Sequence, residues 1–134
     1  MAGELAEVYI PICSLVPAQC GLSKVVNLQQ LVCVNYDELP PIETVLFSED
    51  GQPEPMHLVV DGHHRAYGVY WQGHQAVKGI VARSDEQLSF LSAKSIVGCR
   101  TIDEVVQRYR REWLPAIKAL GVTGIDTMIC PVAV

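Results

Sequence analysis

Short apolar runs separated by polar segments recur along the first two thirds of the chain. β-Branched and aromatic residues dominate these runs, which is typical of strands. Connectors rich in Gly and Pro, such as SEDGQPEP at 48–55, predict loops between them. We therefore predict strands at 7–16, 42–47, 56–61 and 76–82. Because Pro11 lacks an N–H group, the first strand is expected at a sheet edge or with an irregularity there.

Apolar positions three or four residues apart predict helices before and after this strand-rich region. Residues 23–34 fit one face of a helix better than strict alternation, with a strand as the alternative. Capping pairs predict a short helix, SDEQLSFLSA, after Ser84 and a longer one after Thr101. Pro115 is expected to kink the longer helix or start a new segment, and Gly121 to end it.

A central helix is predicted directly after the third strand. Residues 63–72 have helical apolar spacing, follow Gly62 and stop at Gly73. The order strand, helix, strand suggests a crossover unit. Segment 35–41, with two prolines, predicts a turn, and the tail TMICPVAV predicts a final strand or a packed extension.

These elements predict an α+β fold in which a small mixed sheet is flanked by helices. A chain of 134 residues is long enough for one core but not for two ordinary ones. We therefore expect a single domain over 1–134, with its core at 7–83 and a C-terminal helical extension at 84–134.

Composition favours a cytoplasmic globular protein. Hydrophobic residues make up 49% of the chain, a balance that would also suit a homodimer. No run approaches about 18 apolar residues, so no membrane span is expected. Glu4 and Glu7, with no basic residue before the first apolar stretch, differ from a secretory leader. The five scattered cysteines predict reduced, mostly buried thiols.

The charge balance argues against nucleic acid as the main partner. The formal net charge is −5, whereas nonspecific nucleic-acid affinity comes mainly from clustered Lys and Arg. The basic segment RYRREW at 108–113 is interpreted as a solvated helix face. Tyr109 and Trp113, four residues apart, are expected to pack on the sheet or on a second subunit.

The densest chemistry lies in VVDGHHRAYGVYWQGH, residues 59–74. Asp61 ends a strand, Gly62 permits close approach of the backbone, and HHR begins a helix whose first N–H groups lack intrahelical partners. A phosphate there would gain hydrogen bonds and favourable charge, with His64 and Arg65 closing around it. Asp61 is the candidate to hold Mg²⁺ or to act as a base toward a hydroxyl.

Two other interpretations of the same turn stay open. An Asp before Gly often only closes a turn, and neighbouring histidines often cap a helix. A zinc site is the other alternative, although adjacent residues on a helix point about 100° apart and rarely share one ion. Its candidate ligands are Asp61, His57, His63, His64 and His74.

The stretch PPIETVLF…HLVVDGHHRAYGVYWQGHQAVKGIVAR resembles the ParB/sulfiredoxin superfamily. It has a Pro-Ile strand, a loop, an apolar strand that runs into an Asp-Gly-x-His-Arg turn, a helix ending at Gly, and a further strand. The likeness covers 40–83 and, more loosely, 7–16. It implies that a nucleotide, ATP, ADP or CTP with Mg²⁺, binds at this turn.

Within this superfamily the motif is most similar to that of the free serine kinases. Sulfiredoxins carry their catalytic cysteine where this chain has His63, which argues against sulfiredoxin activity. ParB proteins have an arginine-rich box, whereas this chain has only Arg65 there. The resemblance assigns catalysis to Asp61 and His63, the kinase glutamate to Glu38, and nucleotide contacts to Gly62, His64, Arg65, Ser23 and Lys24.

Three functions follow as hypotheses. The first is a nucleotide-dependent enzyme that transfers a phosphoryl group or hydrolyses a nucleotide. The second is a non-catalytic module that senses a nucleotide or anion, or that binds another protein, through dimerisation for example. The third is a ParB-like nuclease or DNA-associated protein, against which the acidic balance counts.

Overall fold

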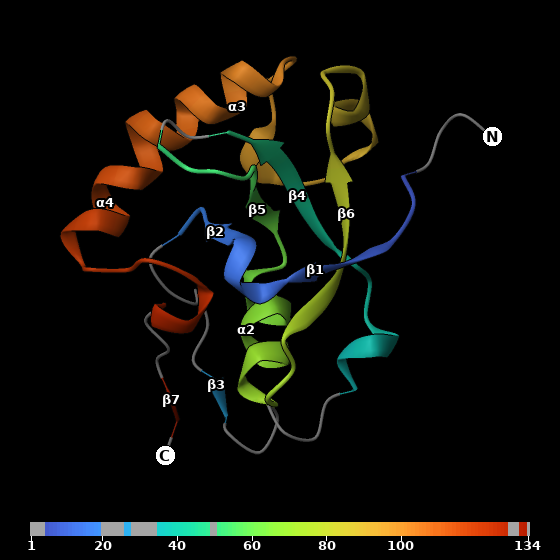
Figure 1. Cartoon of the computed structure of the whole chain (residues 1–134), viewed down its shortest axis with the longest axis vertical. Coiled ribbons are helices and arrows are strands. Elements are labelled where there is room, and N and C mark those ends of the chain that lie inside the picture. Colours follow the sequence, from blue (N-terminus) through green and yellow to red (C-terminus); the bar gives the residue numbers. More distant parts are fainter. Residues whose placement is uncertain (1–4, 20–25, 28–34, 49–50, 129–131, 134) are drawn as a thin grey trace.

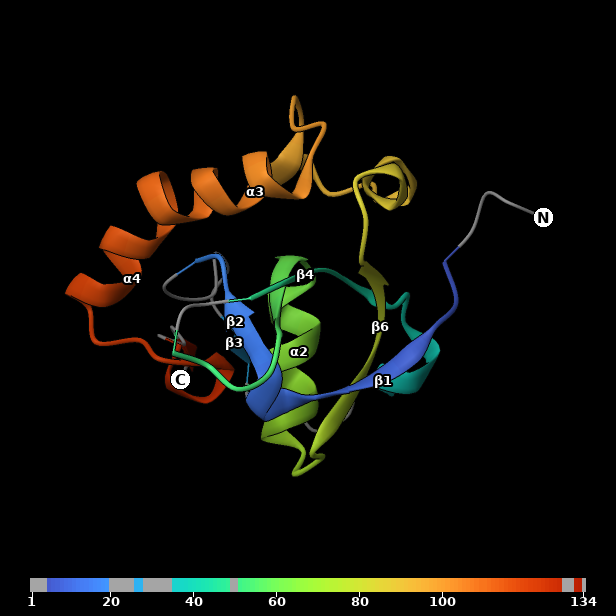
Figure 2. The same ribbon diagram turned by 45° about the horizontal axis from the view of Figure 1, so that its top comes forward.

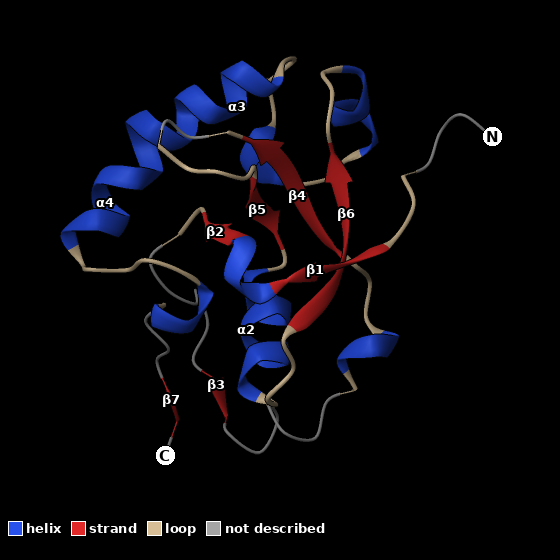
Figure 3. Ribbon diagram, viewed as in Figure 1, coloured by secondary structure: helices blue, strands red, loops and turns tan. Residues whose placement is uncertain are grey.

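A curled five-stranded mixed sheet forms the centre of the protein (Figure 1, Figure 3). The computed structural model describes residues 5–19, 26–27, 35–48, 51–128 and 132–133. The strand order is β1-β6-β4-β5-β2, and the mixed α/β architecture agrees with the predicted fold class. The strands are β1 Val8–Pro11, β2 Leu15–Pro17, β4 Ile42–Phe47, β5 Met56–Asp61 and β6 Ala76–Ala82.

The predicted first strand is two strands at opposite edges of this sheet. A 3-10 turn at Ile12–Ser14 separates β1 from β2, so the continuous strand predicted at 7–16 is wrong in its middle. The four peptide steps from Pro11 to Leu15 span at most about 14 Å, whereas the edges of a flat five-stranded sheet are about 19 Å apart. The short link therefore requires the sheet to curl. Pro11 ends an edge strand, as its missing N–H group predicts.

Strand β4 is the central strand. It pairs in parallel with β6 and antiparallel with β5, so β5 and β6 run in opposite directions on its two sides. The predicted crossover unit is therefore wrong, because such a unit joins parallel strands. Helix α2, His63–Trp71, instead continues from the end of β5, and the chain reverses after it into β6 (Figure 1). Gly73, with φ of +91°, lies at that reversal.

Two very short strands form a separate pair. Strand β3, Val26–Asn27, pairs in parallel with β7, Val132–Ala133. At these two residues the helix predicted for 23–34 is wrong and the strand alternative agrees with the structure. The rest of 23–34 lies outside the described residues. Of the two alternatives predicted for the tail, a final strand agrees with β7. The predicted turn at 35–41 contains a 3-10 turn at Tyr36–Glu38.

The segment after β6 begins with 3-10 turns rather than an α-helix. The capping pair predicted between Ser84 and Gln87 is wrong, because Gln87 Oε1 accepts a hydrogen bond from the Arg83 N–H group at 2.7 Å. A 3-10 turn at Glu86–Phe90 replaces the predicted helix. In a capping box the Gln87 side chain would instead accept from the backbone N–H group of Ser84.

The longer C-terminal helix begins and ends as predicted. Thr101 Oγ1 accepts from the Glu104 N–H group at 3.1 Å at the start of α3, Ile102–Arg108. Helix α4, Leu114–Ala119, follows after a π-helical turn, and Pro115 lies in its first turn. A proline there removes one backbone donor, which the wider turn accommodates. Gly121, with φ of +73°, ends α4.

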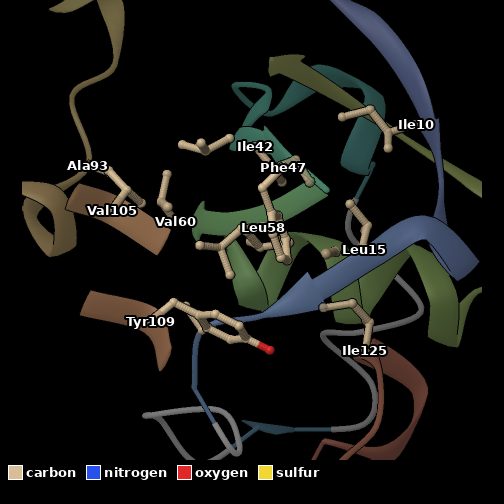
Figure 4. Close-up of a cluster of buried hydrophobic side chains, with 14 of the residues drawn as sticks. Ile10, Leu15, Ile42, Phe47, Leu58, Val60, Ala93, Val105, Tyr109 and Ile125 are labelled. Atoms are coloured by element: carbon tan, nitrogen blue, oxygen red, sulfur yellow. The ribbon is translucent and has the colours of Figure 1, made fainter. Parts of the chain in front are cut away.

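One hydrophobic cluster contains residues from both the predicted core, 7–83, and the predicted C-terminal extension, 84–134 (Figure 4). The Phe47 and Tyr109 ring centroids are 5.8 Å apart, so α3 and its π turn are anchored on β4. Tyr109 therefore packs on the sheet, which is one of the two predicted alternatives. Helix α2 packs on β4 and β6, away from α3 and α4 (Figure 2).

The described part of the chain has no helix long and apolar enough to cross a membrane.

Two of the five cysteines belong to the described residues. Both Cys13 and Cys99 have free thiols. Cys13 is exposed in the turn between β1 and β2, and Cys99 is partly buried, so neither of these two thiols is fully buried. The other three cysteines lie outside the described residues.

A buried glutamate ties the sheet to the C-terminal segment. Glu43 in β4 is only 8% exposed. Its Oε1 accepts from the backbone N–H groups of Ser92 and Ala93, both at 2.8 Å, and its Oε2 accepts from Ser92 Oγ at 2.7 Å. These bonds offset the cost of burying the carboxylate and hold residues 92–93 on the central strand.

Removal of this carboxylate should destabilise the protein. We expect Glu43→Ala to lower the free energy of unfolding by about 3 kcal/mol, because the buried Ala93 N–H group and the partly buried Ser92 N–H group lose their acceptor. Glu43→Gln should cost about 1 kcal/mol, since its amide oxygen can keep both bonds. Urea denaturation measures this, with the exposed Glu38→Ala as control. Equal losses in Glu43→Ala and Glu38→Ala would contradict the role of these bonds.

Candidate functional site

A bulge at the end of β5 orients Asp61. Glu43 is opposite Asp61, but Thr44 is opposite Val59, so Val60 is the extra residue on β5. Ser95 Oγ donates to the Val60 carbonyl at 2.7 Å. Bulges re-aim the side chains that follow them, and the Asp61 side chain is 51% exposed here.

Gly62 connects this strand to α2 and has a conformation that favours glycine. Its φ is +101°, and a Cβ atom at this position would lie 2.6 Å from Ile42 Cγ2. The same Cβ would lie 3.0 Å from Arg65 Nη2. Both the backbone and the space require glycine at this position, which agrees with the freedom that the sequence predicts for it.

The first turn of α2 carries backbone donors of the kind that an anion site uses. The first helical bond runs from the Ala66 N–H group to the Gly62 carbonyl at 2.9 Å, so the N–H groups of residues 63–65 precede the helical ladder. Gly62 supplies no side-chain cap, and the first turn has no acidic residue. Such N–H groups, at the positive end of the helix dipole, are ready donors for a phosphate.

Arg65 lies beside these donors and is already held in place. Its Nη2 donates to Asp61 Oδ2 at 3.2 Å and to the Pro41 carbonyl at 3.3 Å. The Arg65 side chain is 25% exposed, and its Nε is buried with no hydrogen-bond partner among the described residues. The guanidinium therefore has a fixed position and unused donor capacity next to the helix start.

His63 is buried and engaged with the neighbouring edge strand. It is 6% exposed, and its Nε2 accepts from the Ala18 N–H group at 2.9 Å. The pKa of His63 is lowered to about 4, chiefly by burial and also by the nearby His64, while Asp61 acts in the opposite direction. His63 is therefore neutral near pH 7, with its proton on Nδ1. In this arrangement it links α2 to the residue after β2, and its predicted catalytic role stays a prediction.

Glu38 lies in a 3-10 turn and His57 near the start of β5, rather than in this turn. Ser23 and Lys24 lie outside the described residues. Glu38 is exposed in the 3-10 turn before β4. His57 Nδ1 lies 3.2 Å from Ser14 Oγ, between β5 and the turn before β2, and burial lowers the His57 pKa, with a further contribution from Arg83.

A metal site made by the protein alone is not supported within the described residues. They contain no group of three His, Cys, Asp or Glu side chains that could hold an ion. His74 follows the C-terminal end of α2, away from Asp61 at the other end. A structural zinc site needs four ligands, whereas Mg²⁺ is commonly bound through one or two carboxylates and the phosphates of a nucleotide. Asp61 fits only this second kind of site.

Sequence reasoning missed two groups near the turn. Glu43 is opposite Asp61 in the strand pair, and the Pro41 carbonyl accepts from Arg65. A lone glutamate inside the apolar run IETVLF was a signal for the first, because a charge in such a strand needs buried partners. No sequence signal marks a backbone carbonyl as an acceptor.

Comparisons with known proteins add no family assignment. No family model matches the chain, and a search of curated proteins finds no significant match.

The buried His63 predicts a specific loss of stability in acid. Its pKa is about 4 in the folded chain, whereas the ordinary pKa of a histidine is 6.5. Between these values the unfolded chain binds a proton that the folded chain does not. The contribution of His63 to stability is fully present above about pH 6.5 and falls by about 3 kcal/mol as the pH drops to about 4.

This loss is measured by urea denaturation across that pH window. His63→Gln retains an acceptor for the Ala18 N–H group but does not titrate, so its free energy of unfolding should change less with pH than that of the wild type. The exposed His74→Gln serves as control and should follow the wild type. Parallel curves for wild type and His63→Gln would refute the prediction.

Proposed function

We propose that this protein binds the phosphate groups of a nucleotide at the start of α2 and acts as a phosphoryl-transfer enzyme or nucleotide hydrolase. The supporting observation is the uncapped first turn of α2 beside Arg65, whose buried Nε lacks a partner among the described residues. We propose a nucleotide as the source of these phosphate groups because the Asp-Gly-x-His-Arg turn resembles that of the ParB/sulfiredoxin superfamily. ATP, ADP and CTP are the candidates.

The ion pair between Asp61 and Arg65 suggests how binding and chemistry are coupled. An incoming phosphate competes with the Asp61 carboxylate for the Arg65 guanidinium, because both are bidentate acceptors. Asp61 is half-exposed, so its carboxylate can then turn toward a hydroxyl or toward Mg²⁺ that arrives with the nucleotide. Phosphate binding would thus release the candidate base.

The proposed reaction needs one proton acceptor and one leaving group. The oxygen of an alcohol or of a water molecule attacks the terminal phosphorus atom, and Asp61 accepts the proton that this oxygen loses. The bond between that phosphorus and the bridging oxygen breaks, and its electron pair leaves with the shortened nucleotide. Arg65 and the N–H groups of residues 63–65 stabilise the charge on the transferred group.

A non-catalytic nucleotide or anion sensor is the second candidate. It is favoured by the present engagement of both assigned catalytic side chains: Asp61 is paired with Arg65, and His63 Nε2 accepts from Ala18. No further carboxylate or imidazole is needed for binding, which requires only the donors of the helix start and Arg65.

Calorimetry with ATP, ADP and CTP, with and without Mg²⁺, tests the binding proposal. At least one nucleotide should bind, and Arg65→Ala should raise its Kd about tenfold or more, because a charge-assisted bond is lost. The exposed Arg100→Ala is the matched control and should leave the Kd unchanged. No binding of any of the three, or equal Kd values for the two variants, would refute the proposal.

Asp61→Asn separates the enzyme from the sensor. Removal of the competing carboxylate should leave nucleotide affinity equal to or above that of the wild type, since Asn carries no charge. Phosphate release or transfer, followed by ³¹P NMR, should fall to background in this variant if Asp61 is the base. A wild-type protein that binds nucleotide without turnover supports the sensor, and unchanged turnover in Asp61→Asn contradicts the catalytic role of Asp61.

A further inference from the structure

A cavity of about 600 Å³ lies at the opposite end of α2 from the phosphate-binding turn. Its volume is in the range of pockets that bind small organic molecules. The cavity walls come from the turn between β1 and β2, the start of β5, the C-terminal end of α2 and the segment after α4. None of the twelve lining residues belongs to 61–65. This cavity is therefore separate from the site proposed above.

Much of the wall is apolar. Ile12 and Leu15 come from the turn and strand after β1, Met56 begins β5, and Tyr70 belongs to α2. Tyr70 is 38% exposed, so its ring is available to a ligand. Aliphatic, thioether and aromatic groups together suit the flat or aliphatic body of a small molecule.

The polar part of the wall favours positive charge. Asp126 is the only Asp, Glu, Lys or Arg among the twelve lining residues. Its Oδ1 lies 3.0 Å from the position that a Cβ atom on Gly124 would occupy. Thr127 Oγ1 accepts from the N–H groups of Thr123 and Gly124 at 2.8 and 3.0 Å. These bonds hold the turn that presents the carboxylate.

The C-terminal end of α2 also favours a positively charged ligand in this cavity. Tyr70 lies in its last turn and Gly73 just beyond it, where the helix dipole is negative. The two ends of one helix thus favour opposite charges: an anion at its start and a cation at its end. A nine-residue helix is about 13 Å long, so the two sites are too far apart to share reacting atoms.

We propose that this cavity binds a small organic cation with an apolar body, such as an arylalkyl amine. Its ammonium group faces Asp126, and its ring packs on Ile12, Met56 and Tyr70. Recognition rests on the fit of an apolar body and on one charge pair, so a neutral molecule of the same shape binds more weakly and an anion more weakly still.

Three probes with the same indole body test this preference: tryptamine, its alcohol analogue tryptophol, and indole-3-acetate. Kd values from NMR titration of the full chain at about pH 8, where histidines are mostly neutral, should rise in that order. The step from amine to alcohol should be about fivefold, the effect of one partly exposed charge pair. Equal Kd values, a reversed order, or no binding of any probe would overturn the proposal.

The thiol of Cys13 locates the bound probe, because this residue lines the cavity and is exposed. Tryptamine should slow alkylation of Cys13 by iodoacetamide, as measured by peptide mass spectrometry. Cys99 in the same molecule is the internal reference, since it does not line the cavity. Equal slowing at both cysteines, or at neither, would contradict binding at this place.

Substitution of the carboxylate completes the test. Asp126→Asn should raise the Kd of tryptamine about fivefold and bring it close to that of tryptophol. The exposed Asp103→Asn, on α3, is the matched control. Arg65→Ala should leave amine binding unchanged, which separates this site from the phosphate site. An unchanged tryptamine Kd in Asp126→Asn would overturn the proposed role of the carboxylate.

Discussion

The close approach of Gly62 to Ile42 is the constraint on which the candidate site depends. A side chain at residue 62 would collide with the central strand, so α2 can begin this close to β4 only with glycine there. This contact determines where the N–H groups that precede the helical ladder lie. It also brings Arg65 within reach of the Pro41 carbonyl, just before β4, and of Asp61. The anion-binding geometry is therefore a consequence of packing between α2 and the sheet.

The curl of the sheet is the second feature that positions the start of α2. Because β1 and β2 are joined by only three residues yet lie at opposite edges, the sheet has to bring these edges toward each other. The chain after β2 can then reach α2, where the Ala18 N–H group binds His63. His63 thus forms a buried link between the residue after an edge strand and the central helix.

Local sequence signals predicted the elements whose residues interact mainly with near neighbours. Helix α2 and the Thr101 cap follow from periodicity and capping, because the bonds that define them are local. Strand β4 could be predicted from its apolar, β-branched run, but its partners β5 and β6 could not. The break between β1 and β2 and the antiparallel relation of β5 and β6 depend on distant partners, and no local pattern encodes them. The same division applies to the site. The neighbouring Asp61, Gly62 and Arg65 could be predicted together, whereas the partners that bury His63 and Glu43 come from distant segments and could not.

The opposite ends of α2 give this small fold two places where charge can be recognised. The start of the helix offers donors and an arginine, and its end borders a mostly apolar cavity with one carboxylate. The central claim concerns the first of these places, the binding of phosphate by the helix start. Titration of the ¹⁵N-labelled chain with ADP, followed amide by amide in NMR spectra, tests it most directly. The amides of His63, His64 and Arg65 should shift most, and largest shifts elsewhere, or none at all, would contradict a phosphate site at this turn.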